Sequence, residues 1–265
     1  MSLKSFIAGF IEELKSRGEK VPGEKEIQAM ISISNNLFHT ETEEEDLVTS
    51  EAANVQRLCT LTAEIIRRQG ISEQGKIDPD LKALAGVLTY LRSHTMDKLN
   101  YLRKIKGTIA IILAESKECR KYDKLIRSFS RRKDPGFRRK AIDEFDYMVK
   151  AMKDVRQKAK QIEEAIKIVR INSQNMRNIL KGKYDKPFGK MKPLPKLLAD
   201  VLEYNRSGFV LERINEMRDI IARLDEILIK QTRRMPGLRR KIKKVERREK
   251  QAVGFITRYG KALAA

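Results

Sequence analysis

Apolar residues recur every three or four positions along most of this chain, which is the spacing of one face of an α-helix. The clearest case alternates in steps of four and three, with Ser173 as its only polar member. Its positions are Ala141, Phe145, Met148, Met152, Val155, Ala159, Ile162, Ile166, Val169, Ser173, Met176 and Leu180. Such a repeat keeps one seam turned towards a partner helix, as in a coiled coil. No segment alternates with the period of two typical of a strand, so the sequence predicts an all-α fold.

Breaks in this pattern divide the chain into four predicted parts. Residues 1–76 form a smaller, acidic N-terminal helical region, and residues 77–183 form a long helical hairpin. Residues 184–196, rich in lysine and proline, form a linker, and residues 197–265 form a second hairpin. The expected architecture is therefore a set of elongated helical hairpins, or an antiparallel coiled coil.

Local signals place two helix starts. Asp78 followed by Pro79 is typical of an N-cap and first helical residue. The acidic run 41–46 follows Thr40 and contains Thr42, and either threonine is expected to cap a new helix whose first turn the acids would stabilise.

Each predicted hairpin bends at a Pro-Gly pair between arginine pairs. The first reads RRKDPGFRRK, from Arg131 to Lys140, and the second reads RRMPGLRRK, from Arg233 to Lys241. Proline fixes φ and removes a donor, while glycine accepts the left-handed conformation of a chain reversal. We therefore predict a hairpin tip at both places.

The charge of the chain points to a polyanionic partner. It has 57 lysines and arginines against 36 acids, a net charge of +21. Residues 1–80 hold 9 basic and 15 acidic residues, so the excess of positive charge lies in the remainder. The sequence has no apolar run of membrane-spanning length, and Cys59 and Cys119 fit apolar stripes as reduced thiols, so we expect a cytoplasmic protein.

Positive charge is densest around the two predicted tips. Residues 117–140 hold 11 basic and 3 acidic residues, and residues 231–250 hold 10 and 2. Lysines of the linker, which also contains Tyr184 and Phe188, extend the candidate nucleic-acid-binding set. That set is Arg131, Arg132, Lys133, Arg138, Arg139, Lys140, Lys183, Lys186, Lys190, Arg233, Arg234, Arg239, Arg240, Lys241, Lys243, Lys244, Arg247 and Arg248.

Catalytic signals are missing from the sequence. His39 and His94 have no metal-ligand spacing, and no phosphate-binding glycine loop or nucleophile motif occurs. We expect no catalytic residue, metal or cofactor, and so a non-enzymatic protein. A nuclease site built from carboxylates distant in sequence is a minor alternative.

The favoured hypothesis is a helical scaffold that binds DNA or RNA through phosphates, largely independently of base sequence. The alternatives are a membrane-surface scaffold of helical hairpins and a basic subunit of a larger protein or ribonucleoprotein assembly. A membrane is less favoured because the polar face of residues 2–17 mixes lysine with glutamate. The acidic N-terminal region would dock a protein partner or cover the basic surface, and an unpaired seam would allow a homodimer.

Overall fold

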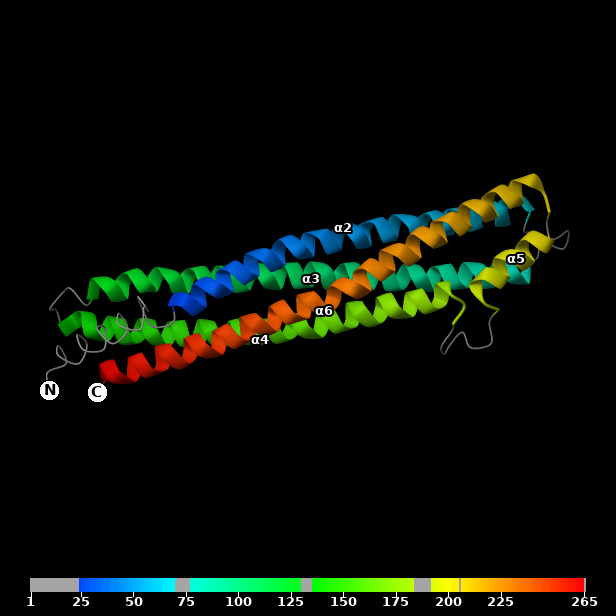
Figure 1. The fold of residues 1–265 in the computed structure, drawn as a ribbon. Coiled ribbons are helices and arrows are strands. Elements are labelled where there is room, and N and C mark those ends of the chain that lie inside the picture. Colours follow the sequence, from blue (N-terminus) through cyan, green and yellow to red (C-terminus); the bar gives the residue numbers. More distant parts are fainter. Residues whose placement is uncertain (1–23, 70–76, 130–134, 184–191, 205, 265) are drawn as a thin grey trace. The chain divides into compact units, whose positions relative to one another are not determined.

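The computed structural model describes residues 24–69, 77–129, 135–183, 192–204 and 206–264. These residues form helices and their connections, with no β-strand among them, so the all-α prediction is confirmed. The helices are α2 (Glu24–Gln69), α3 (Pro79–Phe129), α4 (Pro135–Leu180), α5 (Leu194–Tyr204) and α6 (Gly208–Ala264) (Figure 1).

The chain forms two compact units whose boundaries fall inside α2, α3, α4 and α6. The first unit comprises Met1–Glu41, Lys104–Glu164 and Gly237–Ala265, and the second comprises Thr42–Arg103 and Ala165–Pro236. Within each unit, segments of these four helices pack as a bundle around buried aliphatic side chains (Figure 1). In the part of the chain that is described, no helix has an apolar stretch long enough to span a bilayer.

The predicted start of α3 is confirmed, and α4 ends at Leu180, three residues before the predicted end of the first hairpin. Asp78 Oδ1 accepts hydrogen bonds from the backbone N–H groups of Asp80 (2.9 Å) and Leu81 (3.0 Å), as an N-cap does. Gly182 ends α4 with φ of 72°, and a Cβ at this position would lie 2.5 Å from Pro193 Cβ. Only glycine meets both conditions, which explains why the helix stops here.

The predicted helix start at Thr40 or Thr42 is wrong, because α2 continues through the acidic run. Thr40 Oγ1 donates to the carbonyl of Asn36 at 2.8 Å, a bond made inside a helix. Glu41 and Glu44 are fully buried, since they continue the phase of the apolar stripe. These acids therefore occupy core positions of one long helix.

The second predicted hairpin tip is also wrong, because α6 runs through Pro236 without reversing. The buried positions keep their steps of three and four across the proline: Leu228, Gln231, Met235, Leu238, Ile242 and Val245. An internal proline costs a helix about 3 kcal/mol, which burial of two large apolar side chains offsets. Residues 197–265 are thus not a hairpin.

The linker prediction is partly corrected. α5 begins at Leu194, inside the predicted linker, and buries Leu194, Leu197, Leu198 and Val201. Lys192 precedes α5 and pairs with Asp80 (2.9 Å) and Asp200 (2.8 Å). α6 then starts after Ser207, whose Oγ accepts a hydrogen bond from the backbone N–H of Val210 at 3.3 Å. Residues 184–191, including Tyr184 and Phe188, lie outside the described chain.

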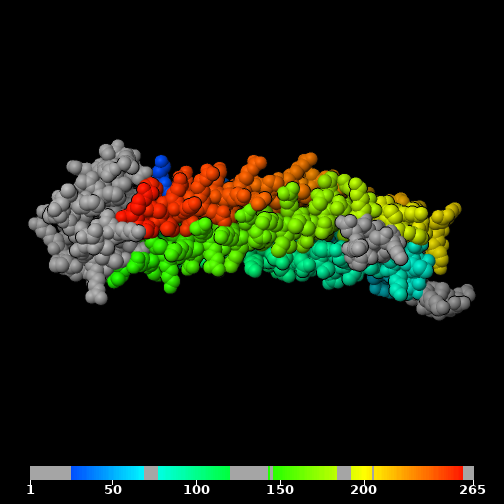
Figure 2. Space-filling model, turned by 90° about the horizontal axis from the view of Figure 1, so that it is seen from below, coloured from blue at the N-terminus to red at the C-terminus, as the bar shows by residue number. Residues whose placement is uncertain are grey.

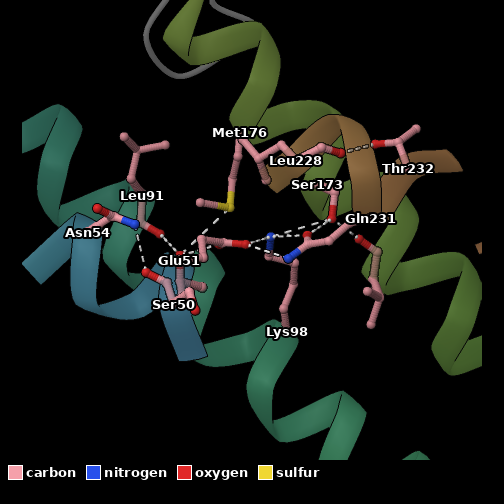
Figure 3. A network of polar contacts seen from close by, with 12 residues as sticks. Ser50, Glu51, Asn54, Leu91, Lys98, Ser173, Met176, Leu228, Gln231 and Thr232 are labelled. Atoms are coloured by element: carbon pink, nitrogen blue, oxygen red, sulfur yellow. Dashed lines mark hydrogen bonds and ion pairs between the residues drawn. The ribbon is translucent and has the colours of Figure 1, made fainter. Parts of the chain in front are cut away.

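A buried polar network joins four helices inside the second unit (Figure 3). Lys98 of α3 and Glu51 of α2 have fully buried side chains, with Nζ 2.5 Å from Oε2. Lys98 Nζ also donates to Gln231 Oε1 of α6 at 3.0 Å and to Ser173 Oγ of α4 at 3.4 Å. Glu51 further accepts hydrogen bonds from Thr95 Oγ1 at 2.6 Å and Gln231 Nε2 at 3.0 Å.

The charges of this network are compensated by hydrogen bonds on all sides. Burial lowers the pKa of Lys98, while the Glu51 carboxylate opposes that shift. A buried ion pair adds little net stability, but removing one member leaves a charge without compensation in a medium of low polarity. The network therefore penalises any packing in which the four helices slide past one another.

We expect Lys98→Met to lower the free energy of unfolding by about 3–5 kcal/mol, because Glu51 loses its buried counter-charge. Urea unfolding followed by circular dichroism measures this loss. The matched control is Lys104→Met, which removes an exposed lysine from the same helix and should change stability by less than about 0.5 kcal/mol. Equal effects of the two substitutions would contradict the role given to the network.

Candidate nucleic-acid interface

Eight of the eighteen predicted binding residues lie outside the part of the chain whose side chains are described. Arg131, Arg132 and Lys133 lie between α3 and α4, and Lys186 and Lys190 lie in residues 184–191. Arg138, Arg139 and Lys140 belong to α4, but their side chains are outside the described set. Lys183 is described and is exposed just after α4. The first predicted tip therefore stays a prediction.

The remaining predicted residues lie on α6, and two of them belong to the second unit. Arg234 pairs with two acids of α2, at 2.9 Å from Glu43 Oε2 and 3.3 Å from Glu44 Oε1. Arg233 is exposed and makes no ion pair with the described residues. Part of the predicted positive charge is thus neutralised by the acidic run of α2.

In the first unit, one flank of α6 contacts α2. Lys241 Nζ donates to Asn36 Oδ1 and, at 3.1 Å, to Thr40 Oγ1. Arg248 lies 3.7 Å from Glu26 Oε1, whose residue is buried. These two cations therefore contact α2 along this flank of α6.

The opposite flank of α6 contacts α4. Arg239 Nε is 2.7 Å from Glu163 Oε1, and Lys243 Nζ is 3.9 Å from the same oxygen. The carboxylate of Glu163 is mostly shielded, at 15% exposure, while the lysine keeps 56% exposure. Lys243 therefore borders the interface with α4 but still reaches solvent.

A third side of α6 carries cations that make no ion pair in the described part of the chain. Arg240, Lys244 and Arg247 are exposed and make no ion pair within the described residues. Their spacing of four and three places them on one face of the helix, opposite the buried positions Ile242 and Val245. They form a straight positive row that points into solvent.

Four further exposed cations extend this surface, and the sequence-based prediction missed them. Lys250 continues α6, while Lys153, Arg156 and Lys160 stand on α4 at spacings of three and four. Figure 2 shows these segments of α4 (green) and α6 (orange to red) side by side on one face of the molecule. We define the basic face as Lys153, Arg156, Lys160, Arg240, Lys243, Lys244, Arg247 and Lys250.

Acids near the basic face are withdrawn from its surface or lie at its ends. Glu249 is 2% exposed, and burial raises its pKa although Arg156 and Lys250 act to lower it. Glu246 is half-buried, and Glu164 is an exposed acid one turn beyond Lys160. The face therefore carries a strong excess of positive charge.

Metal-binding and catalytic sites have weaker support than the basic face among the described residues. No group of three or more histidines, cysteines or acids within them is placed to hold a metal ion. His94 is half-buried edge-on to Tyr90, and burial lowers its pKa. An open hollow of about 410 Å³ between α5 and the start of α6 is lined by Leu202, Leu211 and four other residues, including Arg206. Neither site combines a nucleophile with a base.

Comparisons with known proteins give no further guide. No family model, no curated protein and no solved structure matches this chain. The geometry of the charged surface is therefore the guide to what this protein binds.

Glu44 provides a pH-dependent test of the contact between α2 and α6. Burial raises its pKa from 4.5 to about 7, although Arg234 acts to lower it. A carboxyl with a raised pKa in the folded state binds its proton more tightly there, so its contribution is complete below pH 4.5 and is lost as the pH rises towards 7.

We therefore expect Glu44→Gln to abolish a loss of stability that the wild type shows between about pH 5 and about pH 7.5, worth up to about 3 kcal/mol. The free energy of unfolding of both proteins is measured in urea at each pH. Subtracting one from the other removes the contribution of groups that titrate in both proteins. Glu43→Gln, which removes an exposed charge beside the same Arg234, should follow the wild type. Parallel pH profiles for the wild type and Glu44→Gln would contradict this account.

Proposed function

We propose that this protein is a non-enzymatic helical scaffold that binds nucleic acid through phosphates, largely independently of base sequence. The observation that carries the proposal is the basic face, whose outward row has no carboxylate partner in the described chain. Each phosphate neutralised by such a row releases condensed counterions, which drives binding. Long flexible lysines and arginines spread over two helices favour phosphates over base edges.

The distribution of charge on α6 supports binding over solubility alone. On its two flanks, Arg239, Lys241 and Arg248 contact Glu163, Asn36 and Glu26. Between residues 238 and 252 the only acids are Glu246 and Glu249, and neither is exposed. Solubility requires surface charge of either sign, whereas a single-sign row fixed on rigid helices is suited to a polyanion.

The basic face also fits nucleic acid better than a bilayer. Insertion into lipid requires exposed apolar side chains among the cations. The large exposed apolar residues described in this unit are Ile111 on α3 and Tyr147 on α4. Tyr147 is nine residues from Arg156, which is about two and a half helical turns and so the opposite side of α4.

The hairpin interpretation of α3 and α4 remains part of the proposal. Within the second unit, Lys98 contacts Ser173 at 3.4 Å and Thr95 contacts Met176 at 3.8 Å. Between these two contacts the position on α3 falls by three residues while the position on α4 rises by three, which supports an antiparallel pair. The midpoint of both contacts in sequence lies between Pro135 and Gly136, which fits a hairpin that reverses at the first Pro-Gly pair.

We expect the triple variant Arg240→Gln, Lys244→Gln, Arg247→Gln to lose affinity for a random-sequence 30-base-pair DNA. Its slope of log K against log salt should be shallower by about 2.7, since each contact contributes about 0.9. Fluorescence anisotropy at several salt concentrations measures both quantities.

The control variant Lys82→Gln, Arg92→Gln, Lys104→Gln removes the same charge from exposed sites on α3 and should keep the wild-type slope. Equal slopes for wild type and the α6 variant would refute the proposal. So would binding of the wild type to phosphatidylserine vesicles without binding to DNA or RNA.

A further inference from the structure

The cations of the basic face form two rows on neighbouring helices. One row is Lys153, Arg156 and Lys160 on α4, and the other is Arg240, Lys244 and Arg247 on α6, with two lysines between them. At a rise of 1.5 Å per residue, the α4 row is about 10 Å long and the α6 row from Arg240 to Arg247 is also about 10 Å long.

The two rows lie on antiparallel segments and overlap in part. Glu163 contacts Lys243 of α6, and Arg156 lies close enough to Glu249 to lower its pKa. From the first contact to the second, the position on α4 falls as the position on α6 rises, so the segments run antiparallel. Lys160 then lies level with the part of α6 between Lys244 and Arg247, while Lys153 and Arg240 extend the two rows past each other at opposite ends. Packed helix axes lie about 8–10 Å apart, so the outward side chains form two parallel lines of charge separated by at least that distance.

We infer that the ligand of the basic face is a double-stranded nucleic acid, with each row facing one of its two phosphate backbones. This inference rests on the proposed function and specifies its ligand. The grooves of B-form DNA are about 6 Å (minor) and about 12 Å (major) wide, so cation rows on adjacent helices are separated by a distance in the range between the two backbones of a duplex. A single strand offers one line of phosphates and would leave one row without a partner.

The face also lacks the aromatic side chains that single-stranded ligands use. Such sites stack bases on exposed aromatic rings. In the described parts of α4 and α6 within this unit, Tyr147 lies on the side of α4 away from the face. Phe255 is half-buried, and the guanidinium of Arg258 covers its ring at 5.4 Å from the centroid. This surface therefore provides contacts to the phosphate backbone of a nucleic acid and no rings for base stacking.

The test compares a 30-base-pair DNA duplex with a 30-nucleotide single strand of the same sequence, by anisotropy over a salt series. We expect the wild type to bind the duplex at least about tenfold more tightly near physiological salt. The double variant Lys153→Gln, Lys160→Gln should lower the ratio of duplex to single-strand affinity, because it removes most of one row. Lys82→Gln, Lys104→Gln removes the same charge elsewhere and should leave the ratio unchanged.

The outcomes separate the inference from the proposed function. Equal or tighter binding of the single strand overturns the double-stranded assignment but leaves nucleic-acid binding in place. Duplex binding that responds to the α6 variant but not to Lys153→Gln, Lys160→Gln also overturns it, because only one row would be in use. Failure to bind either ligand overturns the proposed function and this inference together.

Discussion

The arrangement of charge on α6 depends on how its two neighbours neutralise it. In the first unit, Glu26 of α2 and Glu163 of α4 pair with cations on opposite flanks of the helix. The buried stripe of Leu238, Ile242 and Val245 sets the rotation of α6, so Arg240, Lys244 and Arg247 point outward. The ion pairs on the two flanks then neutralise the cations beside the stripe and leave the outward row as the part of α6 with unpaired charge.

In the second unit, an acid at a core position fixes how the helices pack. Glu51 continues the apolar stripe of α2, yet its carboxylate meets Lys98, Thr95 and Gln231. A hydrocarbon core tolerates a shift by one helical turn, because one aliphatic side chain replaces another with little cost. A buried ion pair does not, since a shift leaves each charge unpaired. The network thus supplies the specificity that repetitive apolar seams lack.

The sequence predicted elements well where a local signal acted alone, and poorly where packing overruled it. Asp78 at the start of α3 and the uninterrupted stripe of α4 were read correctly because capping and periodicity are local properties. The Pro-Gly pair at Pro236 predicted a turn, yet α6 continues through it. The apolar stripe keeps its phase across the proline, and the packing energy that retains the helix comes from contacts distant in sequence. The sequence did not predict the α4 row for a related reason. Charge density along the chain detects consecutive cations, whereas a helical face is formed by cations spaced three and four residues apart.

Lysine footprinting by mass spectrometry tests the central claim most directly, because it reports every lysine of the unmodified chain at once. With a saturating 30-base-pair duplex, we expect acylation of Lys153, Lys160, Lys243, Lys244 and Lys250 to slow, while exposed Lys82 and Lys104 on α3 react at their free rates. Protection confined to lysines outside the basic face, or an equal change at all of them, would contradict the assignment of this surface.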